Sequence, residues 1–172
     1  MTRIVGERVV LRPFRQEEFD IALAREPSED AERREVRRRR LALSGTRTAW
    51  ELLYAVESDG RLVGDIQARS SDQAMPPGVW EVGIDLWGET DRGRGIGSEA
   101  VGLLVRHLFA REGAHRIQAT TDLDNVAMRR SLEKCGFSFE GILRGFMPTP
   151  EGGARDYAMY AVTMIDRGEE PG

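Results

Sequence analysis

A glycine-rich turn is the feature of this sequence best suited to binding a ligand. It reads RGRGIGSEA from Arg92 to Ala100 and lies between a strand-like run and a helix-like run. Three glycines in five positions remove side chains, so backbone N–H groups can close on a ligand. The helix that follows directs the positive end of its dipole to the same place. The sequence therefore predicts a site for a phosphate-type anion.

The spacing of this turn does not fit two common phosphate-binding motifs. A P-loop places a lysine directly after its last glycine, whereas Ser98 follows Gly97 here. A Rossmann fingerprint reads G-x-G-x-x-G after the first strand of a βαβ unit, and this turn alternates its glycines in the middle of the chain. The turn is therefore not expected to belong to a P-loop NTPase or a dinucleotide-binding unit.

Composition narrows the class of protein further. The 172 residues, 40% of them hydrophobic, are enough for one domain with a core. A net charge of −4 argues against nucleic acid as a partner and is compatible with a cationic small substrate. The single cysteine, Cys135, cannot form an intrachain disulfide, and no apolar run approaches the ~20 residues of a membrane span. We expect a cytoplasmic protein without a signal peptide, a membrane contact or a metal site.

Hydrophobic periodicity predicts a mixed α/β domain that is neither a repeat protein nor a Rossmann unit. An Asp-Gly turn predicts a hairpin, and Ser28 is the expected cap of the second helix. The domain is expected over residues 1–167, with a disordered tail at 168–172 and a loop at 148–155. The expected strands are residues 3–13, 52–57, 62–68, 79–86, 116–121, 137–140 and 157–164, and the expected helices are residues 17–25, 30–42, 98–112 and 125–135.

Three motifs, which together span Gly6 to Met164, resemble one known superfamily. The turn fits R/Q-x-x-G-x-G/A. Residues 125–137, NVAMRRSLEKCGF, resemble N-x-x-[SA]-x-x-[SA]-x-x-K-x-G-F, with Met128 at the first small position. Residues 6–13, GERVVLRP, resemble the G-x-x-[VLI]-x-L-R-P start of one branch. On these motifs the chain resembles the GNAT superfamily of acyl-CoA-dependent N-acyltransferases, and within it the branch of ribosomal-protein N-terminal acetyltransferases.

This resemblance implies a fold and a co-substrate. The fold is a single α/β (α+β) domain whose central mixed, mostly antiparallel sheet is splayed at the cofactor site and flanked by helices. The co-substrate is acetyl-CoA, with its pyrophosphate on the backbone amides of the turn. Asn125 is either a helix cap alone or also a partner of pantetheine, and the two turn arginines either bind phosphate or are solvated. The implied cofactor-binding residues are Ile84, Asp85, Leu86, Arg92, Gly93, Arg94, Gly95, Ile96, Gly97, Ser98, Asn125, Ser131 and Lys134.

The resemblance also implies direct attack of an amine on the thioester, without a covalent enzyme intermediate. Glu81 is the candidate general base, and Ser131 is the candidate donor of a proton to the departing thiolate. Each has a simpler interpretation, as an ion-paired acid and as an exposed helical serine. Asp85 replaces the aromatic residue common in this branch and would favour a cationic acceptor. Cys135 lies near the negative end of a helix and is expected to pack rather than to react.

The acceptor implied is a primary amine, either a protein N-terminus or a small amine. A catalytically weak acyl-CoA sensor is the alternative from another class. The arginine run from Arg33 to Arg40 suggests an RNA-associated protein, but acidic residues lie within it. Helical spacing predicts the pairs Glu29–Arg33 and Asp30–Arg34, which favours a solvated helix over a nucleic-acid surface. A homodimer is compatible with the sequence.

Overall fold

An eight-stranded mixed sheet forms the centre of the computed structural model, which describes residues 2–26, 28–70 and 75–168. The strand order is β1-β2-β3-β4-β5-β6-β8-β7. All neighbouring pairs are antiparallel except β5 and β6. The expected mixed, mostly antiparallel sheet is confirmed. The strands are β1 (Ile4–Val5), β2 (Val9–Arg12), β3 (Glu51–Ser58), β4 (Arg61–Arg69), β5 (Val79–Leu86), β6 (Arg116–Asp122), β7 (Ser138–Pro148) and β8 (Ala154–Thr163).

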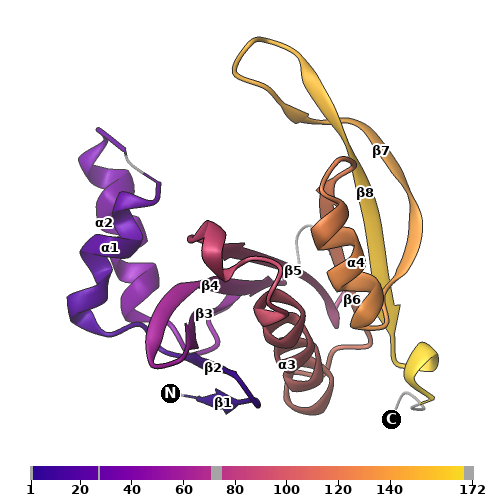
Figure 1. Ribbon diagram of the computed structural model, residues 1–172, viewed down its shortest axis with the longest axis horizontal. Coiled ribbons are helices and arrows are strands. Elements are labelled where there is room, and N and C mark those ends of the chain that lie inside the picture. Colours follow the sequence, from indigo (N-terminus) through magenta and orange to yellow (C-terminus); the bar gives the residue numbers. More distant parts are fainter. Residues whose placement is uncertain (1, 27, 71–74, 169–172) are drawn as a thin grey trace.

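Helices cover both faces of this sheet. Figure 1 shows α1 and α2 together at one end, α3 near the middle, and α4 beside the long β7–β8 hairpin. The four α-helices are α1 (Phe19–Ala24), α2 (Ala31–Ala42), α3 (Ile96–Arg111) and α4 (Val126–Lys134). Short 3₁₀ turns are η1 (Gln16–Glu18), η2 (Glu89–Asp91) and η3 (Ile165–Arg167).

Alternation along β3 explains how both faces become apolar. Leu52, Tyr54 and Val56 join the large core cluster that also contains the buried residues of α3 and Leu132 of α4. Leu53 and Ala55 point the other way and pack with residues of α1 and α2. The sheet therefore separates a face covered by α3 and α4 from a face covered, at one end, by α1 and α2.

Three expectations about local structure were wrong. The expected strand over residues 3–13 is two strands, β1 and β2, which pair antiparallel with each other. The cap of α2 is Asp30 rather than Ser28, because the Asp30 side chain accepts the backbone N–H groups of Glu32 and Arg33. The last two strands are longer than expected and shorten the loop 148–155, since β7 continues to Pro148 and β8 begins at Ala154. Two irregularities in the β7–β8 register accommodate the glycines of β7. The expected tail lies, from residue 169 on, outside the described residues.

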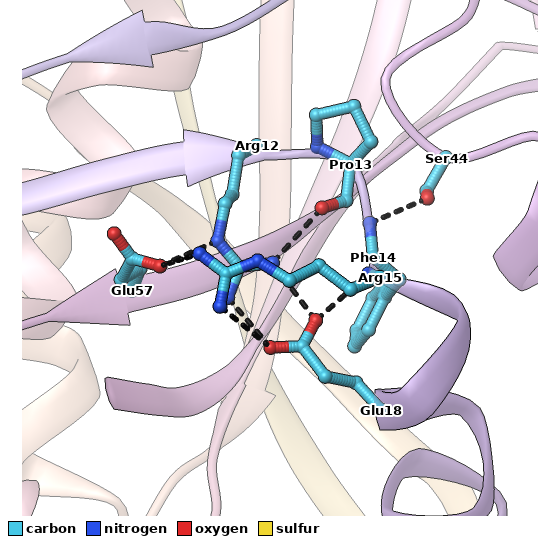
Figure 2. Close-up of polar contacts among 7 residues, drawn as sticks. All are labelled: Arg12, Pro13, Phe14, Arg15, Glu18, Ser44 and Glu57. Carbon is cyan, nitrogen blue, oxygen red and sulfur yellow. Dashed lines mark hydrogen bonds and ion pairs between the residues drawn. The ribbon is translucent and has the colours of Figure 1, made fainter. Parts of the chain in front are cut away.

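A cluster of buried charges fixes the start of α1 against the sheet (Figure 2). Arg12 on β2 donates to Glu18 from Nη2 at 2.7 Å and to Glu57 on β3 from Nε at 2.6 Å. Arg15 adds a bond from Nη2 to Glu57 at 3.1 Å, and Ser44 Oγ accepts the Phe14 N–H at 2.8 Å. These contacts hold the α1–α2 unit in place above β3 and β4.

Candidate active site

The parallel pair β5–β6 opens at the centre of the sheet. Its register runs only from Val79–Arg116 to Glu81–Gln118 among the described residues. β5 stays paired with β4 on its other side as far as Leu86. The backbone groups of the second half of β5 are therefore available to a ligand along one edge. This is the splay expected from the sequence, and the predicted residues Ile84, Asp85 and Leu86 lie along it.

The glycine turn follows at the end of this open edge. Gly93 and Gly95 have φ angles of 72° and 83°, a conformation that residues with a Cβ rarely adopt. α3 begins at Ile96, two residues earlier than predicted, and no side chain of the described residues caps it. The first N–H groups of α3, at Ile96, Gly97 and Ser98, therefore have no partner within their helix. The geometry suits an anion bound by main-chain donors.

The two turn arginines have protein partners. Arg92 Nη2 donates to the Leu86 carbonyl at 3.1 Å, which ties the turn to the end of β5. Arg94 lies 3.5 Å from the Asp59 carboxylate and 3.9 Å from that of Asp91. Asp91 is buried and also pairs with Arg61 at 3.1 Å. These ion pairs shape the turn, and they leave the backbone amides as the main candidates for anion binding.

α4 lies next to the start of α3. Asn125 caps α4 and accepts the Met128 N–H at 3.1 Å. The Ser131 hydroxyl donates to the Ala127 carbonyl at 3.0 Å, so its proton is held within the helix in this conformation. The Cys135 thiol donates to the Ser98 carbonyl at 3.1 Å, and burial raises the pKa of that thiol. Cys135 is thus a packed, protonated residue, as expected from the sequence.

A pocket of about 660 Å³ lies where α3 begins and α4 ends. It brings together three predicted cofactor residues, Gly95, Ser98 and Lys134. Arg8 and Arg106 add two cations that sequence reasoning did not identify. Glu99 also lines this pocket and accepts the backbone N–H groups of Arg8 and Val9 at 2.8 and 3.1 Å.

Glu81 lies on the opposite face of the sheet from α4. Its carboxylate accepts a hydrogen bond from Arg69 Nη2 at 3.1 Å, and its side chain is 27% exposed. Leu132 of α4 packs in the α3 cluster, so α4, which carries Ser131, covers the face of the sheet opposite to the Glu81 side chain. Within the described residues, no hydrogen bond or ion pair joins Ser131 and Glu81. They can act on one substrate only if it lies in the opening between β5 and β6.

A larger pocket, of about 800 Å³, lies on the same face as Glu81, between α2 and strands β3 and β4. Three polar residues of β4, Asp65, Gln67 and Arg69, line it. They stand opposite Asp85, Gly83 and Glu81 of β5. The sequence did not single out Asp65, because the alternation of apolar and polar residues shows only that it lies on the polar side of a strand.

Five of the six arginines of α2 form ion pairs with acidic side chains. Arg38 binds Asp20 at 2.7 Å, Arg39 binds Glu35 at 3.0 Å and Arg33 lies 3.6 Å from Asp30. Arg37 pairs with Glu26, and Arg40 with Glu51. The predicted pairs Glu29–Arg33 and Asp30–Arg34 are not among the ion pairs of the described residues, because Asp30 caps the helix and its carboxylate faces the first turn.

Within the described residues, no group of three His, Cys, Asp or Glu side chains is placed to hold a metal ion. None of the described helices has the length and apolar character needed to cross a bilayer.

Comparison with protein families gives the class of this protein. The model of the acetyltransferase (GNAT) domain matches residues 8–138. The chain therefore belongs to the GNAT acetyltransferase family, whose members use acetyl-CoA, and it is an acetyl-CoA-dependent acyltransferase. No curated protein sequence matches the chain significantly.

Solved structures share this fold over nearly the whole chain. RimJ from Mycobacterium smegmatis, in complex with CoA-disulfide, is 22% identical, with a TM-score of 0.78 over 99% of this chain and 91% of its own. A GNAT-family acetyltransferase from Bacillus anthracis is 21% identical, with a TM-score of 0.73 over 95% and 99%. RimL, a ribosomal L7/L12 α-N-protein acetyltransferase in complex with coenzyme A, is 18% identical, with a TM-score of 0.73 over 94% and 98%.

Proposed function

We propose that this protein transfers an acetyl group from acetyl-CoA to a primary amine by direct attack of the amine on the thioester. The observation that carries the proposal is the opening of β5 from β6 directly before the glycine turn. The opening leaves backbone groups of β5 and the first N–H groups of α3 next to one another on one side of the sheet. The pocket beneath α2 lies on the other side, where an acceptor can approach.

The turn is the proposed site of the CoA pyrophosphate. The dipole of α3 adds ~0.3–1 kcal/mol to anion binding, and each hydrogen bond to a charged group adds ~1.5–3 kcal/mol. Several backbone amides together therefore outweigh either arginine. Arg8, Arg106 and Lys134 supply positive charge beside the turn, suited to the remaining phosphate of CoA. The proposed contacts with pantetheine are Ile84, Asp85, Leu86, Asn125 and Ser131.

The acceptor amine must lose a proton before it attacks. At pH 7 this costs about 1.4 kcal/mol for an α-amine of pKa ~8 and about 4.6 kcal/mol for a lysine of pKa ~10.4. A carboxylate on the acceptor face lowers that cost, and Glu81 is the candidate given by the sequence. A backbone N–H of β5 would stabilise the oxyanion, and Ser131 would give a proton to the CoA thiolate as the C–S bond breaks.

A peptide N-terminus is our first candidate for the acceptor. The fold is shared with RimL, which is named as an acetyltransferase of the α-amine of a ribosomal protein. An α-amine also needs the least help from a base, as the figures above show. A small amine is the second candidate, since the larger pocket is of the size that small ligands occupy.

Two measurements test the proposal. Calorimetry with acetyl-CoA should show binding, and release of the CoA thiol should depend on an added amine. The amines are Ser-, Ala- and Gly-initiated tripeptide amides and putrescine, each tested with acetyl-CoA and succinyl-CoA. Binding without turnover on any amine would instead support an acyl-CoA sensor, and an absence of binding would exclude both functions.

A further inference from the structure

Asp65 has an unusual place among the carboxylates of the larger pocket. It lies on β4, directly opposite Asp85 of β5, and lines the pocket beneath α2. Its carboxylate accepts one hydrogen bond, from the Trp87 indole Nε1–H at 3.1 Å. Within the described residues no arginine forms an ion pair with it.

Arg40 and Glu26, whose charges act on Asp65, already have partners. Arg40 on α2 donates to Glu51 on β3 and, at 2.9 Å, to Gln67 on β4. Glu26, which follows α1, pairs with Arg37 at 2.9 Å. Asp65 is thus a half-buried carboxylate without its own cation, in a pocket whose arginines are neutralised. An incoming ammonium group would supply the missing charge.

A glycine lies between Asp65 and the open edge of β5. Gly83 lies diagonally across from Asp65, at a spacing of about 7–8 Å in a regular antiparallel pair. A Cβ at Gly83 would meet only Gln67, at 3.6 Å from Nε2 and 3.9 Å from Cγ. Because Gly83 has no side chain, it does not separate the pocket from the edge of β5 that faces the opening.

We propose that Asp65 binds the ammonium group of the acceptor and takes its proton, so that the acceptor is a cationic amine entering through the pocket beneath α2. This inference rests on the proposed acetyl transfer. One ammonium N–H bond breaks, and its proton passes to Asp65. The freed nitrogen attacks the thioester carbon, and the bonded nitrogen then loses a second N–H proton to solvent. The C–S bond breaks, and the CoA sulfur takes a proton from Ser131, which solvent restores. Asp65 releases its proton to solvent through the pocket.

The electrostatics of the pocket suit this role. Burial raises the pKa of Asp65 to about 6, and the negative charges of Asp85 and Glu26 act in the same direction. The hydrogen bond from Trp87 and the charge of Arg40 oppose the rise. Arg25, which donates to the Trp87 carbonyl, is the other charged group beside the indole. A base whose pKa lies near the working pH is efficient, whereas Glu81 is held by Arg69 and would position that arginine.

The decisive experiment compares Asp65→Asn with wild type in kcat/KM for a Ser-initiated tripeptide amide across pH 5 to 10. The kcat/KM of wild type should follow a bell-shaped pH profile, which rises through about pH 6 and falls above the α-amine pKa of ~8. The variant should lose the limb near pH 6 and react only through the neutral amine, so its kcat/KM should instead rise through the amine pKa of ~8. At pH 7 the kcat/KM of the variant should be at least ~10²-fold below that of wild type. Its affinity for CoA should not change. Asparagine still accepts the Trp87 N–H, so folding is preserved.

Two further variants complete the test. Asp20→Asn removes an exposed carboxylate that pairs with Arg38, and the pH profile of this variant should keep both its acid and its basic limb. Trp87→Phe removes the hydrogen bond that lowers the Asp65 pKa, so the acid limb should move to higher pH.

Each outcome separates the inference from the proposed function. If wild type binds acetyl-CoA but releases no thiol with any amine, both fail. If wild type is active and Asp65→Asn keeps its rate and its limb near pH 6, only the role of Asp65 is overturned. Loss of that limb in Glu81→Gln instead would assign the base to Glu81.

Discussion

Arg12 and Glu18 form two side-chain hydrogen bonds, from Nη1 to Oε2 at 2.8 Å and from Nη2 to Oε1 at 2.7 Å. Both side chains are nearly buried, at 7% and 10% exposure. Arg12 belongs to the sheet and Glu18 to the turn before α1, so the pair joins the sheet to the helices that roof the larger pocket (Figure 2).

Removing the arginine should destabilise the protein strongly. Arg12→Met leaves Glu18 and Glu57 buried beside one another with Arg15 as their remaining cation. Breaking a buried pair in this way costs about 3–5 kcal/mol. Arg39→Met, which breaks the exposed pair with Glu35, is the control and should cost about 1 kcal/mol or less. Urea unfolding measures both, and equal losses would contradict the importance of the buried cluster.

The same pair predicts how stability depends on pH. Burial alone would raise the pKa of Glu18, but the hydrogen bonds from Arg12 and from the Arg15 backbone outweigh it, and the net pKa is lowered. A lowered folded-state pKa gives stability that is complete above the unfolded value of ~4.3 and is lost as pH falls through the folded value. In Glu18→Gln the unfolding free energy should be smaller at pH 7 and fall less steeply between pH 5 and 3. An unchanged slope would contradict this linkage.

Local patterns in the sequence predicted the helix α3 and the glycine turn before it, whereas long-range contacts did not follow from them. The spacing of Val101, Leu104 and Leu108 places them on one face of the helix expected over residues 98–112, and all three are buried. Asp65 carries no such signal. The alternation in β4 predicts a polar residue at this position whether the residue faces water or a pocket. Only the order of the strands and the placement of α2 show that Asp65 lines a pocket.

Gly95 should matter more for CoA binding than Arg94. Gly95→Ala places a Cβ in left-handed backbone, 2.8 Å from Arg8 Nη2, and shifts the amides of the turn. We expect the Kd for CoA to rise at least ~10-fold, which corresponds to about 1.4 kcal/mol, and to rise less for Arg94→Ala. Gly113→Ala is the matched control, because its φ of 65° gives similar strain beyond the other end of α3. Calorimetry that found equal losses in both glycine variants would exclude a specific role for the turn.

Ser131→Ala should slow the reaction and leave the affinity for CoA nearly intact. The hydroxyl must turn from the Ala127 carbonyl to protonate the thiolate, and alanine cannot replace it. General acid catalysis is worth ~10²–10⁴ in rate, so kcat should fall within that range. Ser138→Ala, at an exposed position where β7 begins, is the control. An unchanged kcat in Ser131→Ala would leave the hydroxyl with a structural role in α4.

The arginines of α2 should not support nucleic-acid binding. Five of them pair with acidic neighbours, and binding through phosphate contacts requires cations that can replace counterions. A fluorescent poly(U) oligonucleotide titrated with the protein should therefore show no binding at 150 mM salt, a concentration of about physiological strength. Lowering the salt distinguishes weak electrostatic attraction from a specific site, because attraction of that kind rises steeply as salt is removed. Tight binding that persists at high salt would instead require an RNA surface built by other means than these paired arginines.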